Sequence, residues 1–139
     1  MALPSKLTLE IVTPEGLLLR EDVDELVAPG ADGYFGVRPG HTPLMAALGL
    51  GELSYRLAGS WRRLTCFSGW CEVLPDRVNI LADMGERAED IDVGRAEQAL
   101  ARAEERMRRI KDEEGYADVH LAYVRAVTRL AVARHQRGQ

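Results

Sequence analysis

Arginine side chains are the groups in this chain whose type and spacing most directly suggest chemistry. Arg95 lies in the expected first turn of a helix that follows Ile91–Asp92, where the helix dipole already favours anions over cations. Arg125 and Arg129 are spaced i, i+4 on a later helix, although like charges at that spacing repel by roughly 0.2–0.5 kcal/mol. Planar guanidinium groups bind phosphates and carboxylates through paired N–H donors. Arginines from both helices could therefore converge on a polyphosphate or on an acidic protein surface.

A solvated helix face is the alternative interpretation of the same residues. Four arginines share one stripe of the first expected helix: Arg95, Arg102, Arg106 and Arg109. Glu97, Glu105 and Glu113 are near enough along the chain to form ion pairs with basic residues. The spacing of the arginines leaves both interpretations open.

The sequence contains no recognisable catalytic constellation. His41 has no serine or cysteine nucleophile motif to accompany it, which favours a hydrogen-bonded structural histidine. The acidic pairs Glu21–Asp22 and Asp24–Glu25 are more typical of turns and surfaces than of a general acid and base. Cys66 and Cys71 are expected to be free thiols, buried or half-buried on opposite strand faces, since no further cysteine completes a zinc site. We expect a protein that is not an enzyme, with no metal site and no required cofactor.

Charge is distributed unevenly along the chain, whose formal net charge is −4. Residues 1–90 hold 8 basic and 14 acidic side chains, whereas residues 91–139 hold 10 basic and 8 acidic ones. No acidic residue follows Val119. A domain that binds nucleic acid needs a basic face, so the overall acidity argues against nucleic acid as the main partner.

The hydropathy pattern argues against membrane insertion. No apolar run approaches the ~20 residues that cross a bilayer, and Met1–Lys6 contains no signal-peptide core. We expect a cytosolic protein, or one bound peripherally on the cytosolic side of a membrane.

Alternating hydrophobicity dominates the first part of the chain. Leu7, Leu9 and Ile11 alternate with polar residues, which is typical of a half-buried strand. Further candidate strands are Leu17–Leu19, Glu25–Ala28, Glu52–Leu57, Trp61–Phe67, Trp70–Leu74 and Arg77–Ala82. Short strands separated by Gly- and Pro-rich turns predict an all-β sandwich or barrel. Its expected core includes Trp61, Phe67, Trp70, Val73, Val78 and Ile80.

A helical repeat replaces the alternation near Ile91. Apolar residues then recur on one helix face: Ala96, Ala99, Leu100, Ala103, Met107 and Ile110. Asp92 or Asp90 can cap the start of this helix, and Gly115 can end it. Asp118 can cap a second helix, whose apolar positions are Leu121, Val124, Val127 or Thr128, and Ala131.

These two helices predict an antiparallel α-helical hairpin, because their connection is short. The seam between them is rich in alanine, so at about 0.8 kcal/mol per buried methylene its docking is weak compared with a leucine-lined seam. Both helices have good intrinsic propensity and can persist while they separate. The chain should therefore divide into a β-sandwich, residues 1–88, and a hairpin suited to switching, residues 89–139.

Pro29–Leu44 is the densest Gly/Pro stretch of the chain. It lacks the Lys-Ser/Thr of a phosphate-binding loop and the strand-to-helix context of a dinucleotide motif. It is either a set of tight turns or an ordered loop that offers Tyr34 and Phe35 to a partner.

Five short motifs carry a family resemblance when they are taken together: Val12–Gly16, Gly36–Leu44, Gly69–Val73, Val78–Ala82 and Glu89–Asp92. Over essentially its full length the chain resembles the bacterial type of epsilon subunit of rotary F-type ATP synthase. The resemblance implies a β-sandwich followed by a helical hairpin, with no active site of its own. It also implies a central-stalk subunit that turns with the gamma subunit on the membrane-embedded c-ring, peripheral on the cytoplasmic face of the inner membrane. Such a subunit couples ion-driven c-ring rotation to ATP synthesis.

The resemblance further implies regulation. The family's hairpin inhibits ATP hydrolysis by extending toward the catalytic alpha/beta head, and in some bacterial members the folded hairpin binds ATP. The residues that match or resemble its ATP contacts are Glu86, Ile91, Asp92, Arg95, Ala96, Arg102, Arg125 and Arg129. The expected c-ring contacts are Asp32, Tyr34, Phe35 and His41. The chain departs from the family at Tyr34, where an acidic residue is common, and at Gly94, which loosens the first helical turn.

A free-standing ATP-sensing module is the alternative function. It differs from a rotor subunit in one respect that can be observed, namely whether the β-module pairs with a long coiled-coil partner.

Overall fold

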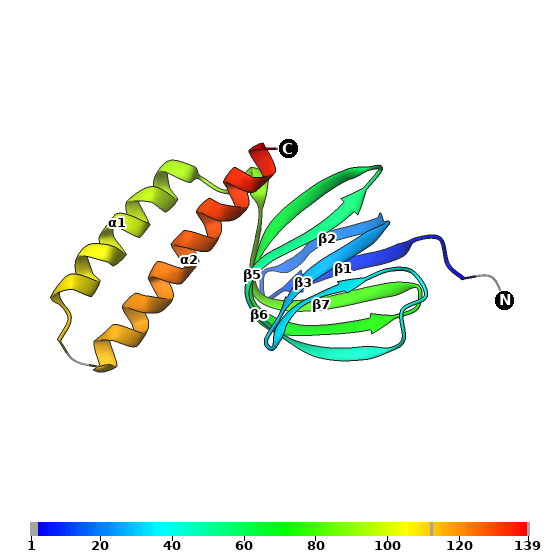
Figure 1. The fold of residues 1–139 in the computed structure, drawn as a ribbon, viewed down its shortest axis with the longest axis horizontal. Helices are drawn as coiled ribbons and strands as arrows, with labels where there is room; N and C mark the ends of the chain where they lie inside the picture. Colours follow the sequence, from blue (N-terminus) through cyan, green and yellow to red (C-terminus); the bar gives the residue numbers. More distant parts are fainter. Residues whose placement is uncertain (1–2, 112, 139) are drawn as a thin grey trace.

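The computed structural model describes residues 3–111 and 113–138, with the side chains of residues 113 and 114 left out of the description. Strands precede helices along the chain (Figure 1). The strands are β1 (Leu7–Thr13), β2 (Gly16–Val23), β3 (Glu25–Gly30), β4 (Gly33–Val37), β5 (Leu44–Leu57), β6 (Ser60–Leu74) and β7 (Arg77–Arg87). A 3-10 turn, η1 (Ala88–Asp90), leads to helices α1 (Val93–Arg109) and α2 (Glu113–Arg137).

The strands form a β-sandwich, as the alternation predicted. Their hydrogen-bonded order is β2-β1-β7-β6-β5-β3-β4. Only β1 and β7 pair in parallel; the other described neighbours are antiparallel. The long strands β5 and β6 carry the sheet from one layer to the other, so the sheet folds over itself around one core (Figure 1). Leu7, Leu9 and Ile11 lie in that core and are at most 1% exposed.

Two strand predictions are wrong in detail. The stretch Pro29–Leu44 was expected to form turns or an ordered loop, but it contains β4, and β5 begins at its last residue. Residues 33–37 pair with β3, and residues 44–51 pair with β6. The candidate strands 61–67 and 70–74 form a single strand, β6. Ser68 (φ 63°) and Gly69 (φ 136°) bend this strand without ending it.

Two side-chain predictions are wrong because the strand bends at Ser68–Gly69. The bend reverses the phase of the alternation, so Cys66 and Cys71 both face the core and do not lie on opposite faces. Both thiols are free and buried, as expected, and desolvation raises the pKa of each to about 12. Trp70 was expected in the core but is 57% exposed, because it lies on the outer face of the rephased strand.

Asp92 begins α1, as predicted: its carboxylate accepts a hydrogen bond from the backbone N–H of Arg95 at 3.0 Å. The other helix boundaries differ from the prediction. Ile110 takes an extended conformation and ends α1, whereas Gly115 and Asp118 lie inside α2. One glycine costs a helix only about 1 kcal/mol, which the packing of α2 can offset.

The helical hairpin is confirmed, and α2 lies between α1 and the sandwich (Figure 1). Ala96 and Ala103 are buried on α1, as the repeat predicted. On α2 the buried residues are Val119, Ala126, Leu130, Val132 and Ala133, not the predicted face. The reason is that α2 packs against two neighbours at once, so its buried positions spread around the helix. Val132 and Ala133 form a small second core with Ala88 and Ile91.

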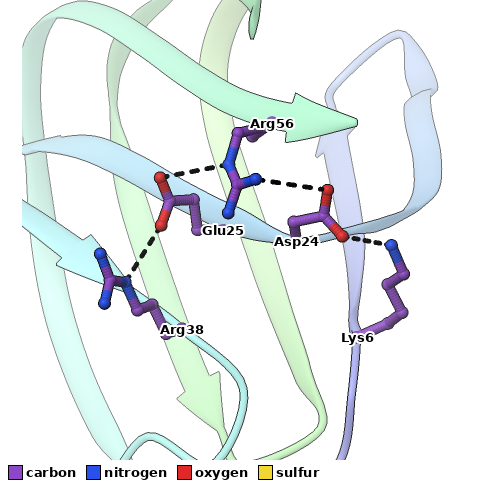
Figure 2. A network of polar contacts seen from close by, with 5 residues as sticks. All are labelled: Lys6, Asp24, Glu25, Arg38 and Arg56. Carbon is purple, nitrogen blue, oxygen red and sulfur yellow. Dashed lines mark hydrogen bonds and ion pairs between the residues drawn. The ribbon is translucent and has the colours of Figure 1, made fainter. Parts of the chain in front are cut away.

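An ion-pair network fastens one edge of the sandwich (Figure 2). The Asp24 carboxylate contacts Lys6 and Arg56, and the Glu25 carboxylate contacts Arg56 at 3.5 Å and Arg38 at 3.0 Å. The hydrogen bond from Lys6 is the main cause that lowers the pKa of Asp24. The network links the start of β1 to β3, β5 and the end of β4, which agrees with a surface role for this acidic pair.

Neither helix of the described chain combines the length and apolar character needed to cross a membrane.

Candidate functional site: an arginine-lined pocket beneath the hairpin

A pocket of about 350 Å³ lies where the end of β7, the turn η1, the start of α1 and the helix α2 meet. Its walls are Glu86, Asp90, Ile91, Asp92, Arg95, Ala96, Ala99, Arg102 and Arg129. All the residues predicted to contact ATP line it except Arg125. Asp90 and Ala99 were not predicted. The volume is in the range of small-molecule sites.

The start of α1 supplies one wall of the pocket. Asp92 caps the helix, which holds the backbone N–H of Arg95 against its carboxylate at 3.0 Å. Arg95 and Arg102 are exposed and lie two turns apart on the pocket side of α1. Ile91 is 7% exposed and anchors this corner in the second core. The Arg95 and Arg102 side chains are thus exposed, whereas the start of their helix is held in place.

The opposite wall is an ion pair between β7 and α2. Arg129 Nε donates to Glu86 Oε1 at 2.6 Å, and the two side chains are 24% and 33% exposed. The backbone N–H of Glu86 donates to Thr65 Oγ1 at 2.9 Å, and Thr65 is fully buried in β6. A carboxylate therefore already occupies one edge of Arg129, in the way that a phosphate oxygen could.

Arg125 lies beside the pocket, against the ring of Phe67. Its Cζ is 5.9 Å from the ring centroid, and the Cζ of Arg129 is 5.4 Å from the same centroid. Arg125 Nε is buried and has no hydrogen-bond partner among the described residues. Phe67 itself is 1% exposed.

Besides Asp90 and Ala99, sequence reasoning missed two residues that support the pocket from behind, Thr65 and Phe67. Phe67 was assigned to the sandwich core and Thr65 was not considered. Residues 63–67 are all buried, which means that both faces of β6 are covered there. The uncharged run Leu64–Phe67 was the available signal, since a strand with one solvated face should alternate.

Part of the helix charge is neutralised outside the pocket, as the solvated-face interpretation expected. Glu105 pairs with Arg108 at 3.2 Å and with Arg109 at 2.8 Å, and Glu97 pairs with Arg134 at 3.3 Å. Within the stripe of four arginines, the ion pair with Glu105 confirms the solvated-face interpretation for Arg109.

The four predicted c-ring contacts do not form one cluster. Asp32 is exposed in the β3–β4 turn. Tyr34 is 61% exposed, but its hydroxyl accepts from the backbone N–H of Glu52 at 3.1 Å and it lines a groove beside α2. Phe35 is half-buried against the sandwich core, so the expected exposed aromatic pair is corrected to one exposed tyrosine. His41 lines a different pocket, with Nδ1 2.6 Å from the carbonyl oxygen of Thr42.

An apolar row crosses the outer face of the sandwich. Cross-strand pairing places Trp70 beside Ala47 and Leu81, Leu81 beside Val12, and Val12 beside Leu17. Met45 extends the row along β5. Exposures are 62% for Met45, 57% for Trp70, 60% for Leu81 and 61% for Leu17. A contiguous exposed apolar surface of this kind typically marks a protein contact.

Metal chemistry finds no support in the described part of the chain, where no group of three or more His, Cys, Asp or Glu side chains could hold an ion. The pocket wall carries three arginines, Arg95, Arg102 and Arg129, together with the carboxylates of Glu86, Asp90 and Asp92. The guanidinium groups are the part of this wall that could bind an anion.

Comparison with known proteins gives a consistent assignment. Residues 6–88 match the model of the β-sandwich domain of the ATP synthase delta/epsilon chain, and residues 89–134 match the model of its long α-helix domain. The ATP synthase epsilon chain of Syntrophobacter fumaroxidans is 48% identical over 128 residues, which cover 92% of this chain and 96% of that one. The epsilon chain of Solibacter usitatus is 44% identical over 131 residues, covering 94% and 98%.

A solved structure shares the fold. A chain in the cryo-EM structure of the Euglena gracilis mitochondrial ATP synthase, comprising OSCP, F1 and c-ring, superposes with a TM-score of 0.82 at 21% identity. The match covers 94% of this chain and 83% of that chain. With both family models matched and relatives more than 40% identical over nearly all of its length, this chain belongs to the epsilon-chain family of ATP synthase.

Proposed function

We propose that this chain is a non-catalytic rotor subunit of an F-type ATP synthase, which couples c-ring rotation to ATP synthesis. Its β-sandwich binds the gamma subunit and the c-ring, and the chain meets the cytoplasmic face of the inner membrane only through the complex. Family membership and the outer apolar row support this proposal. The row gives the sandwich a surface that needs a protein partner to remove it from water.

The hairpin regulates the enzyme by opening. In the closed form, α2 contacts the sandwich through Arg129–Glu86, through His135 Nδ1 and Glu52 Oε1 at 3.0 Å, and through Gln136 Nε2, which donates to the Trp61 carbonyl at 3.0 Å. These partly exposed polar contacts are individually weak. An opened hairpin would free its arginines to engage acidic surface on the alpha/beta head and block ATP hydrolysis.

ATP is the ligand that we assign to the arginine-lined pocket. The observation that carries this assignment is the convergence of Arg95 and Arg102 from α1 with Arg129 from α2 on one pocket. The pocket exists only while the helices are closed, so ATP would stabilise that form. A ligand at 100 times its Kd adds about 2.7 kcal/mol to the state it binds, which is comparable with the docking of an alanine-rich seam.

Calorimetry on the full chain tests the assignment. The wild type should bind ATP, and Arg95→Ala and Arg129→Ala should each weaken binding at least tenfold, since a hydrogen bond to a charged group contributes about 1.5–3 kcal/mol. Arg109→Ala is the matched control, because Arg109 pairs with Glu105 away from the pocket. Absence of binding by the wild type at millimolar ATP would refute the sensor while leaving the inhibitory hairpin standing.

Co-purification separates the rotor subunit from a free-standing ATP-sensing module. Extraction of the native membrane should release this chain together with the gamma subunit and the rest of the ATP synthase. Recovery of the chain alone would favour the free-standing module.

A further inference from the structure

Two arginines of α2 share one aromatic ring of the sandwich. Arg125 and Arg129 are one helical turn apart, and their Cζ atoms lie 5.9 Å and 5.4 Å from the centroid of Phe67. The ring is 1% exposed and belongs to β6, a strand of the rigid module. Both distances are within the roughly 6 Å over which a ring face attracts a guanidinium group.

This arrangement offsets a repulsion that α2 could not remove by itself. Like charges spaced i, i+4 repel, and Glu86 neutralises only Arg129. Arg125 Nε has no hydrogen-bond partner in the described chain, although it is buried. The negative ring face of Phe67 is the favourable electrostatic contact that the structure provides to both guanidinium groups.

We propose that Phe67 is a positioning residue for the anion pocket: its ring orients Arg125 and Arg129 and so sets the affinity of the closed hairpin for nucleotide phosphates. The inference rests on the proposed ATP function. It adds that β6 takes part in binding without touching the ligand. Arg125, which does not line the pocket in the ligand-free structure, would supply its unpartnered N–H to phosphate oxygens when ligand enters.

Two replacements at position 67 test the proposal in the full chain. Phe67→Leu removes the ring, whereas site-specific pentafluorophenylalanine keeps its approximate shape and reverses its quadrupole. Each should raise the calorimetric Kd for ATP about five- to tenfold. Phe35, the other of the two phenylalanines, is the matched control: the same fluorinated residue there should leave the Kd unchanged, because Phe35 packs against the sandwich core.

Thermal melting separates positioning from simple packing. A packing role would lower the Tm of the fluorinated chain and leave its Kd for ATP at the wild-type value, and that result would overturn the proposal. A raised Kd in the fluorinated chain would support it, whether or not the Tm also falls through loss of the cation–π contact.

A measurement without ligand tests the role of Phe67 separately from the assignment of ATP to the pocket. In the wild type, the Nε–H resonances of Arg125 and Arg129 should show an upfield ring-current shift that disappears in Phe67→Leu. If that shift is present but the wild type binds no ATP, the contact of Phe67 with the two arginines is confirmed and the ATP assignment fails. Identical resonances in the two proteins would show that the Phe67 ring does not position the two arginines, and would overturn the proposal.

Discussion

Arg129 is the residue at which hairpin closure and the proposed ligand binding would meet. Its guanidinium group donates to Glu86 at 2.6 Å and lies over Phe67, so it holds α2 against β7 and β6 before any ligand arrives. A phosphate would compete with the Glu86 carboxylate for the same donors. Under the proposed function, the pair would keep the pocket formed at low ligand concentration and would limit the affinity for the anion.

Gly69 is the residue on which the course of β6 depends most directly. Its φ is 136°, and a Cβ atom placed on it would lie 2.0 Å from the backbone oxygen of Leu81. Gly69→Ala should lower the free energy of unfolding by about 3–4 kcal/mol, because backbone strain and a clash with backbone act together. Chemical denaturation measures the change.

Gly59→Ala is the control for that prediction. Gly59 also has a positive φ, 81°, but nothing lies within 4 Å of a Cβ placed there. Only the backbone strain remains, so the cost should be about 1–2 kcal/mol. If both substitutions lower the free energy of unfolding equally, the close approach of Gly69 to Leu81 adds nothing to the backbone strain.

Helix α2 differs from α1 because it is buried on two sides. Ala126 and Leu130 are buried within the hairpin region, while Val132 and Ala133 pack with Ala88 and Ile91. The strands, by contrast, are held by continuous backbone ladders around their own core. Release of the hairpin should therefore leave the ladders intact.

A chain shortened to residues 1–88 tests this independence. It should fold and melt cooperatively, because the core residues Leu7, Leu9 and Ile11 make their contacts among strands. Its Tm should be lower than that of the full chain, since the loss of α2 uncovers Phe67. Circular dichroism measures both properties. A non-cooperative melt would contradict the prediction that residues 1–88 fold independently of the hairpin.

Taken as a whole, the molecule keeps its two candidate functional surfaces apart. The arginine-lined pocket lies under the hairpin, whereas the outer apolar row from Met45 to Leu17 lies on the exposed face of the sandwich. A partner bound to the row would leave the hairpin free to open. Under the proposed function, this separation would let the subunit stay assembled while the hairpin opens.

Introducing a negative charge into the row tests its role in assembly. Trp70→Glu and Leu81→Glu should each weaken binding to the gamma subunit by more than about thirtyfold, because exposed aromatic and apolar anchors at an interface contribute about 2 kcal/mol or more. Their folds should persist, since the side chains are 57% and 60% exposed. Tyr116→Glu, on the 44% exposed Tyr116 of α2, is the control. If both row variants bind the gamma subunit as tightly as the wild type, the gamma subunit must contact a different surface.

The sequence by itself determined the local features of this protein. The alternation at Leu7, Leu9 and Ile11 predicted a strand, the repeat at Ala96 and Ala103 predicted a helix, and both were confirmed. These features depend on residues a few positions apart, whose period matches the geometry of one element. The family resemblance rested on short motifs of the same kind, and the comparisons confirmed it.

Only the tertiary structure decided which distant residues meet. Glu86 and Arg129 are 43 positions apart, and their contact depends on how α2 returns across β6 and β7. The same return covers the second face of β6, so Phe67 lies beneath arginines and not in the sandwich core. Periodicity shows that a residue is buried, but it does not show against what, because the partner is chosen by the packing of whole elements.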